Sequence, residues 1–106
     1  MTDSLNGTSL EGLRAQLDEI DERLLRLVRE RIELIVRIAE YKREHDVPMM
    51  QPHRVDAKYE RATAFAVENG LGPAYLRRLY EVIIEESCRV EDEVIGVPDG
   101  QRDNAR

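Results

Sequence analysis

The amino-acid sequence predicts an all-α fold: a three-helix chain with one long N-terminal helix that needs a partner chain. Of the 106 residues, 36% are charged, and many Leu, Ile and Val residues occur with a single Phe and no Trp, which suits a leucine-type helical core. Apolar residues recur three and four positions apart from Leu10 to Tyr41, the spacing of one buried stripe on a helix. We expect one helical domain over residues 8–96, between disordered tails at 1–7 and 97–106.

The first helix has a start signal and a stop signal. Thr8 and Glu11 have the spacing of a capping box. The helix should end near His45, because Pro48 disfavours helical geometry in the residue before it. A helix of this length measures roughly 55 Å, whereas a compact chain of this size has a radius of gyration of about 13 Å. The apolar stripe of this helix therefore needs a partner chain to cover it.

Proline and glycine mark the other two helices. The second is expected to begin with Pro52 and to end at Gly70, which suits a C-terminal cap. The third is expected to run from Gly72-Pro73 to about Ile95. The apolar face of the second helix comprises Val55, Tyr59, Ala62, Phe65 and Ala66. The stripe of the third comprises Leu76, Leu79, Tyr80, Ile83 and Ile84, and continues into Ser87, Cys88 and Glu91.

One cation, Arg31, interrupts the apolar stripe of the first helix, and a second, Lys42, follows its last residue. Arg31 and Lys42 are eleven residues apart, a net rotation of about 20°, so both face the core. A buried cation requires an anion. That anion is either an acidic residue of the protein or a carboxylate of a ligand, which Arg and Lys both bind well. A third arrangement lays the aliphatic stem along the stripe with the charged head in solvent.

Further polar residues at helical spacing extend this candidate site. Gln51 and Arg54 lie at the start of the second helix, where backbone N–H groups favour anions. Ser87 and Glu91 are one turn apart on the third helix. Together with Arg31 and Lys42 these residues predict a polar cavity for a small, multiply anionic molecule.

Arg14 lies about 42 Å along the first helix from Lys42. It is adjacent to the strict apolar stripe, so a solvated surface position is one interpretation. The two residues can serve one site only if Arg14 comes from an antiparallel partner chain.

Composition excludes several classes of partner. The net charge of −6 argues against nucleic acid and anionic membranes, which select basic surfaces. The single cysteine, Cys88, is expected to be a small buried residue, and the chain carries no apolar N-terminal run. We therefore expect a cytoplasmic location. No spaced His/Cys cluster suggests a metal, and no cofactor is expected.

Four segments resemble one family in their order and spacing. They are LRAQLDEIDERLLRLVRER around Arg14 and Arg31, I-x-x-Y-K ending at Lys42, QPHRV around Arg54, and IIEES before Glu91. Over residues 9–95 the chain resembles the all-helical chorismate mutases of the AroQ type. The resemblance implies an intertwined homodimer with two sites, each completed by the other protomer, and no cofactor or metal. It also implies the Claisen rearrangement of a dianion.

The resemblance implies a role for each matching residue. Arg31 and the Arg14 of the other protomer look like carboxylate clamps. Lys42 looks like the donor to the ether oxygen and a carboxylate, Arg54 like a supporting cation, and Ser87 like a contact to the ring carboxylate.

Two positions depart from the family's commonest pattern. Val55 stands where a Glu often meets the C4 hydroxyl of chorismate, and Glu91 stands where a Gln usually donates to the ether oxygen. A carboxylate donates only when protonated, so Glu91 must be protonated or have another role.

These departures leave the substrate open. We rank 4-amino-4-deoxychorismate slightly ahead of chorismate. QPHRV and ENGL also look like the isochorismate pyruvate lyases that release salicylate, the next alternative. A non-catalytic helical dimerisation module, with its cations paired to Glu residues, is the alternative from a different class.

Overall fold

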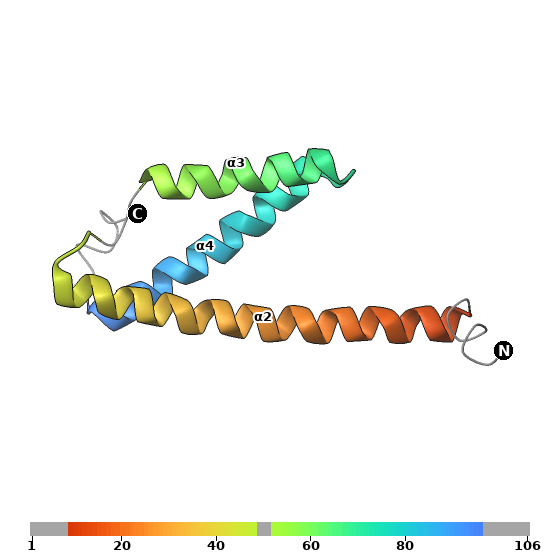
Figure 1. Ribbon diagram of the computed structural model, residues 1–106, viewed down its shortest axis with the longest axis horizontal. Coiled ribbons are helices and arrows are strands. Elements are labelled where there is room, and N and C mark those ends of the chain that lie inside the picture. Colours follow the sequence, from red (N-terminus) through yellow and green to blue (C-terminus); the bar gives the residue numbers. More distant parts are fainter. Residues whose placement is uncertain (1–8, 49–51, 97–106) are drawn as a thin grey trace. The chain divides into compact units, whose positions relative to one another are not determined.

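The computed structural model describes residues 9–48 and 52–96. The described chain forms three helices, α2 (Leu10–His45), α3 (Pro52–Glu68) and α4 (Pro73–Ile95), so the predicted all-α class is confirmed (Figure 1). The chain divides into two compact units, Met1–Glu33 and Leu34–Arg106, and α2 runs through both. The predicted tails and the candidate site residue Gln51 lie outside the described residues.

A serine caps the start of α2. The Ser9 hydroxyl accepts a hydrogen bond from the Gly12 N–H at 3.0 Å, and the Ser9 carbonyl accepts the Leu13 N–H at 2.9 Å. This side chain therefore satisfies one of the N–H groups that lack a partner within the helix. Thr8, predicted as the cap, lies outside the described residues. The cap that the structure describes is one residue further along.

The end of α2 at His45 agrees with the prediction from Pro48. Asp46 follows in the left-handed region, with φ of 54°. The Val47 N–H then donates to the Lys42 carbonyl at 3.0 Å, which is the bond of a Schellman motif. This turn fixes the backbone of Lys42 at the end of the helix.

The connection between α3 and α4 repeats this geometry. Gly70 has a φ of 68°, and the Leu71 N–H donates to the Ala66 carbonyl at 2.8 Å. Gly70 therefore has the C-terminal role predicted for it. Gly72 is the N-cap of α4, and Pro73 occupies the first turn, where a missing N–H costs nothing.

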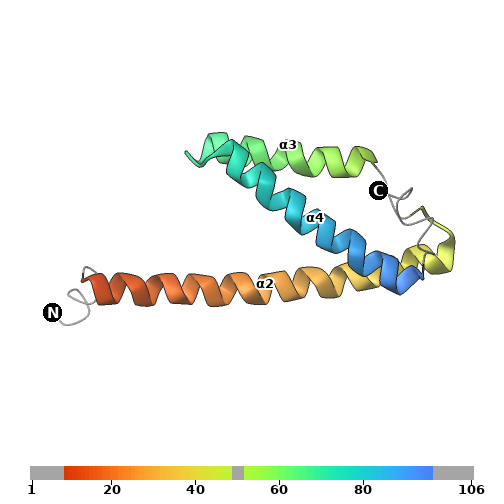
Figure 2. The same cartoon turned by 180° about the vertical axis from the view of Figure 1, so that it is seen from behind.

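Helices α3 and α4 pack against one another beyond this connection (Figure 2). Ala62 and Ala66, both on the predicted apolar face of α3, are buried. The Arg77 guanidinium of α4 lies 4.6 Å from the centroid of the Tyr59 ring of α3, a cation–π contact between the two helices. Phe65, predicted for the same face, is exposed.

Within the second unit, α2 buries a different face from the one predicted. Ala39 is fully buried and Ile35 and Val36 are half-buried. By contrast, Leu34 and Tyr41, predicted for the buried stripe, are more than half exposed. The end of α2 therefore has two apolar faces, one of them uncovered.

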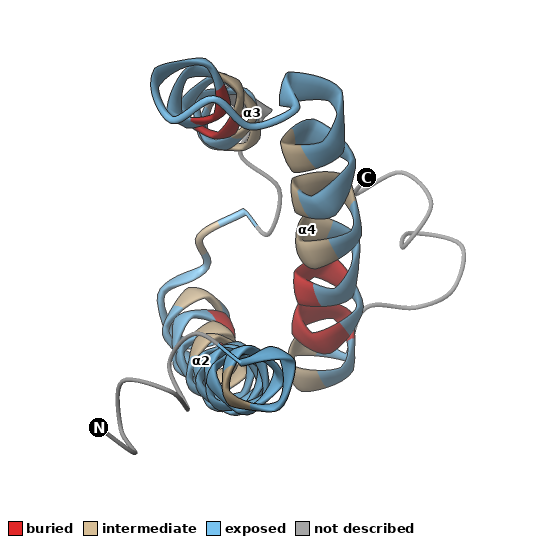
Figure 3. Cartoon of the chain, turned by 90° about the vertical axis from the view of Figure 1, so that its right-hand side faces the viewer, coloured by how far each residue is buried: buried red, intermediate tan, exposed pale blue. Residues whose placement is uncertain are grey.

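The uncovered stripe also runs along α2 in the first unit. Its exposed members there are Leu10, Leu13, Leu17, Ile20, Leu24 and Leu27. Figure 3 shows the contrast, because buried residues gather in the C-terminal half of α4, whereas most of α2 is exposed. Large apolar residues at regular helical spacing are normally covered in a stable protein.

Charged residues on the outside of α4 form a local network. Arg89 pairs with Glu86 and Glu93, one turn away in either direction. The hydrogen bond from Arg89 holds the pKa of Glu86 below its ordinary value, and these carboxylates raise the pKa of Arg89. In the part of the chain that the structure describes, no helix is long and apolar enough to cross a membrane.

Candidate active site

Lys42 and Glu91 form an ion pair between α2 and α4. Lys42 Nζ donates a hydrogen bond to Glu91 Oε1 at 2.9 Å. The two side chains are only 14% and 10% exposed. Figures 1 and 2 both show the C-terminal end of α4 beside the end of α2. Two residues that are 49 positions apart in the sequence thus share one mostly buried contact.

Helical spacing brings these side chains to the interface between the two helices. Lys42 lies one turn after Ala39 and two turns after Ile35, on the face of α2 that the second unit buries. Glu91 lies one turn after Ser87 on α4, and both are buried. The Ser87 hydroxyl donates to the Ile83 carbonyl of its own helix at 3.0 Å.

The pair settles which anion Lys42 meets in this structure. The sequence left open whether this anion is an acidic residue of the protein or a ligand carboxylate. In the structure it is an acidic residue, Glu91. A charge-assisted hydrogen bond of this length between partly dehydrated groups is strong, but the desolvation of both ions offsets much of its benefit. A ligand oxygen that reaches Lys42 must share or replace the contact with Glu91.

The candidate residues on α3 do not join this pair. Arg54 is exposed and Val55 is half-buried in the first turns of the helix. Among the described residues, no hydrogen bond or ion pair connects Arg54 to Lys42 or Glu91.

The remaining candidates belong to the first unit. Arg14 is exposed and Arg31 is half-buried, both on α2. The structure therefore brings together three of the predicted residues: Lys42 and Glu91, which pair, and Ser87, one turn from Glu91 on α4.

Two residues near the pair were missed by sequence reasoning. Asp92, next to Glu91, is 1% exposed. Its position one turn after Cys88 on the predicted stripe was a signal that could have identified it. Arg43, next to Lys42, donates from Nη1 to the Val94 carbonyl at 2.9 Å. No pattern in the sequence indicates a contact of this kind between a side chain and a distant backbone group.

Comparisons with known proteins agree on one family. Residues 13–92 match the family model described as chorismate mutase type II. The chain is 52% identical to a 4-amino-4-deoxychorismate mutase of Streptomyces pristinaespiralis, over 81% of this chain and 67% of the relative. It is 55% identical to the 4-amino-4-deoxychorismate mutase of Streptomyces venezuelae, over 81% of this chain and 84% of the relative.

A more distant relative is the chorismate mutase of Methanocaldococcus jannaschii, with 26% identity over 81% of this chain and 87% of the relative. No solved structure matches the chain.

Proposed function

We infer the reaction from the family: the chain belongs to the chorismate mutase type II family and is a mutase for a chorismate-type substrate. We propose that this substrate is 4-amino-4-deoxychorismate, rearranged to 4-amino-4-deoxyprephenate. The observation that carries the proposal is the identity of 52% and 55% to two mutases named for that substrate. The chorismate mutase of Methanocaldococcus jannaschii is only 26% identical.

The reaction requires positioning and electrostatic stabilisation. In a Claisen rearrangement the C–O bond of the ether breaks as a C–C bond forms within the same molecule, and no proton is transferred. The protein must hold the flexible dianion in the reactive conformer and stabilise the negative charge that develops on the ether oxygen. Fixed cations in a site with little water perform both tasks.

Lys42 is suited to stabilise the ether oxygen. Its ammonium group is mostly buried and is held by Glu91 at 2.9 Å, so it is already oriented when an ether oxygen comes to share this contact. In this proposal Glu91 orients Lys42 in the ligand-free enzyme. This role does not require Glu91 to donate a hydrogen bond to the ether oxygen.

The substituent at C4 distinguishes the two substrates. An amino group can carry a positive charge, which a hydroxyl cannot, and a buried carboxylate such as Glu91 favours a cation nearby. Val55, at the start of α3, provides no hydrogen-bonding side chain for a hydroxyl. Both residues support the amino substrate.

Other predicted residues complete the proposed site. Arg31 and the Arg14 of a second protomer hold the carboxylates, since a planar guanidinium binds a carboxylate through two parallel hydrogen bonds. Arg54, Gln51 and Ser87 surround the substrate. This assignment requires a homodimer with shared sites.

The uncovered stripe on α2 supports the homodimer. Its residues are exposed by 44% at Ile38 to 63% at Leu10, at regular helical spacing. A second copy of the same helix has the matching surface, as expected for a two-fold interface. The interface would also allow Arg14 to reach the partner's site.

Product identification tests the substrate directly. The protein is incubated separately with 4-amino-4-deoxychorismate, chorismate and isochorismate, and the products are identified by mass spectrometry. We expect 4-amino-4-deoxyprephenate as the main product. Release of salicylate from isochorismate, without rearrangement of the other two compounds, would identify a lyase instead. The relatives reported above have mutase names, which favours the mutase.

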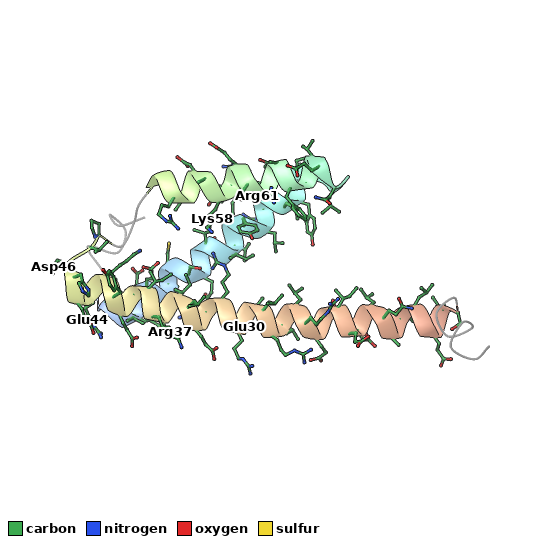
Figure 4. All side chains as sticks on the ribbon, viewed as in Figure 1. Glu30, Arg37, Glu44, Asp46, Lys58 and Arg61 are labelled. Carbon is green, nitrogen blue, oxygen red and sulfur yellow. The ribbon has the colours of Figure 1, made fainter. Side chains whose placement is uncertain are left out.

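Matched variants show whether an observed activity belongs to this site. Lys42→Met should abolish the rearrangement. Lys58→Met changes an exposed lysine on α3 (Figure 4) and should retain it. Equal activity in both variants would indicate a contaminating enzyme.

A ligand titration separates the enzyme from a non-catalytic dimerisation module. A bicyclic dicarboxylate that mimics the transition state should raise the melting temperature, because a ligand that binds the native state stabilises it. An unchanged melting temperature at about 1 mM mimic, roughly a thousandfold above a micromolar dissociation constant, would favour the module.

A further inference from the structure

Two adjacent cations at the end of α2 contact one turn of α4. Lys42 Nζ donates to the Glu91 carboxylate, and Arg43 Nη1 donates to the Val94 carbonyl, each at 2.9 Å. Glu91 and Val94 are three residues apart, so they lie on one side of α4. The first contact belongs to the candidate site, and the second joins the Arg43 side chain to a backbone carbonyl.

The Val94 carbonyl needs a donor from outside its own helix. The last four carbonyls of an α-helix have no partner within the helix. If the helix continued, Val94 would accept the N–H of residue 98, but that residue is Pro98, which has no N–H. The Asp92 carbonyl, by contrast, accepts the N–H of the cap residue Gly96 at 2.9 Å.

Arg43 matches this carbonyl in charge as well as in hydrogen bonding. The C-terminal end of a helix carries a partial negative charge, which a nearby guanidinium stabilises. Arg43 itself belongs to the last turn of α2, where the Schellman motif closed by Val47 fixes the backbone. A fixed helix end thus provides the donor for a helix end that otherwise tends to fray.

We propose that Arg43 is a positioning residue: by holding Val94 it keeps the last turns of α4 against α2, at the distance at which Lys42 and Glu91 pair. Without this contact the end of α4 frays and the mean separation of Lys42 and Glu91 grows. The consequence for catalysis rests on the proposed function, because Lys42 acts there on the ether oxygen. The effect of Arg43 on the pairing of Lys42 with Glu91 does not depend on the proposed function.

The structural part is tested by the coupling between Lys42 and Glu91. We measure the urea midpoint of unfolding for the wild type, Lys42→Met, Glu91→Gln and the double variant, at one protein concentration. The same four proteins are then made with Arg43→Met added. The coupling is the difference between the midpoint shift of the double variant and the sum of the shifts of the two single variants. We expect Arg43→Met to reduce it to less than about half.

Three further variants sharpen the result. Arg37→Met removes an exposed arginine of the same helix (Figure 4), and should leave the coupling unchanged. Arg43→Lys retains a cationic donor and should restore most of it. If Arg43→Met does not fold, Arg43→Ala, which also lacks a donor, takes its place. A coupling that is the same with and without the Arg43 side chain would overturn the proposal.

Kinetics test the consequence for the site. Arg43→Met should lower kcat by about tenfold with little change in KM, because Lys42 would be misplaced for a charge that develops only in the transition state. Arg43→Lys should recover most of this loss. A rise in KM alone would contradict the positioning role. A wild type without mutase activity would refute the proposed function, while the coupling experiment would still decide the role of Arg43.

Discussion

Lys42 and Glu91 meet 2.9 Å apart between α2 and α4, with both side chains mostly buried. Removing one member of such a pair leaves the other as a buried charge without its counter-ion. Replacing both members by uncharged residues avoids this cost. A single substitution in this pair should therefore destabilise the protein more than the double substitution does.

We predict that Lys42→Met lowers the free energy of unfolding by about 3 kcal/mol. The free energy of unfolding of the double variant Lys42→Met/Glu91→Gln should be much closer to that of the wild type than that of Lys42→Met is. Urea unfolding at fixed protein concentration measures both. The exposed pair Arg78 and Glu81, 3.3 Å apart on α4, is the control, and its removal should change stability by less than about 1 kcal/mol. A double variant less stable than Lys42→Met would show that Lys42 does not compensate Glu91.

Arg31 should be required for activity and dispensable for assembly. We expect Arg31→Ala to lower kcat/KM by at least about a hundredfold, because a carboxylate of the substrate loses its bidentate partner. Size-exclusion chromatography with light scattering should still find the dimer. Arg37→Ala, an exposed arginine on the same helix, should behave as wild type. Loss of the dimer in Arg31→Ala would assign that residue to the interface instead.

Mixing two inactive variants tests whether each site is shared. Arg14→Ala and Arg31→Ala each disable both sites of a homodimer in this account. In a mixed dimer one site has both substitutions and the other has neither. Random exchange of equal amounts should therefore restore about a quarter of the wild-type activity. No recovery, with mixed dimers demonstrated by mass spectrometry, would contradict sites built from two chains.

The turn after α2 contains a residue that glycine should replace with benefit. Asp46 has a φ of 54°, a conformation that disfavours side chains with a Cβ atom. Asp46→Gly should raise the free energy of unfolding by up to about 1 kcal/mol, less the extra freedom of glycine in the unfolded chain. Asp46→Ala, which keeps the Cβ and loses the polar group, should lower it. A loss of stability in Asp46→Gly would show that the carboxylate contributes more than the strain costs.

The bounds of the helices were predictable because local chemistry determines them. Pro48 ends α2 near His45, Pro73 starts α4, and Gly70 adopts the left-handed conformation that ends α3. Each signal acts within a few residues of the chain. The start of α2 was missed by one residue because Thr8 and Ser9 are both good caps, and the capping-box spacing to Glu11 favoured Thr8.

The partner of Lys42 was not predictable from the sequence in the same way. Desolvation requires an anion for a buried cation, but the chain has 22 acidic residues, and Glu91 is 49 positions away. Which acid approaches depends on the face of α2 that packs against α4. Helical periodicity predicts Leu34 for the interior and does not select Ala39, yet the structure shows Ala39 buried and Leu34 exposed.

The preference between the two substrates tests the central claim most directly. We would measure kcat/KM for 4-amino-4-deoxychorismate and for chorismate with the same enzyme preparation. The account predicts a value at least about tenfold higher for the amino substrate, because a buried carboxylate and an apolar Val55 favour an amino group over a hydroxyl at C4. Equal values, or a higher value for chorismate, would contradict it.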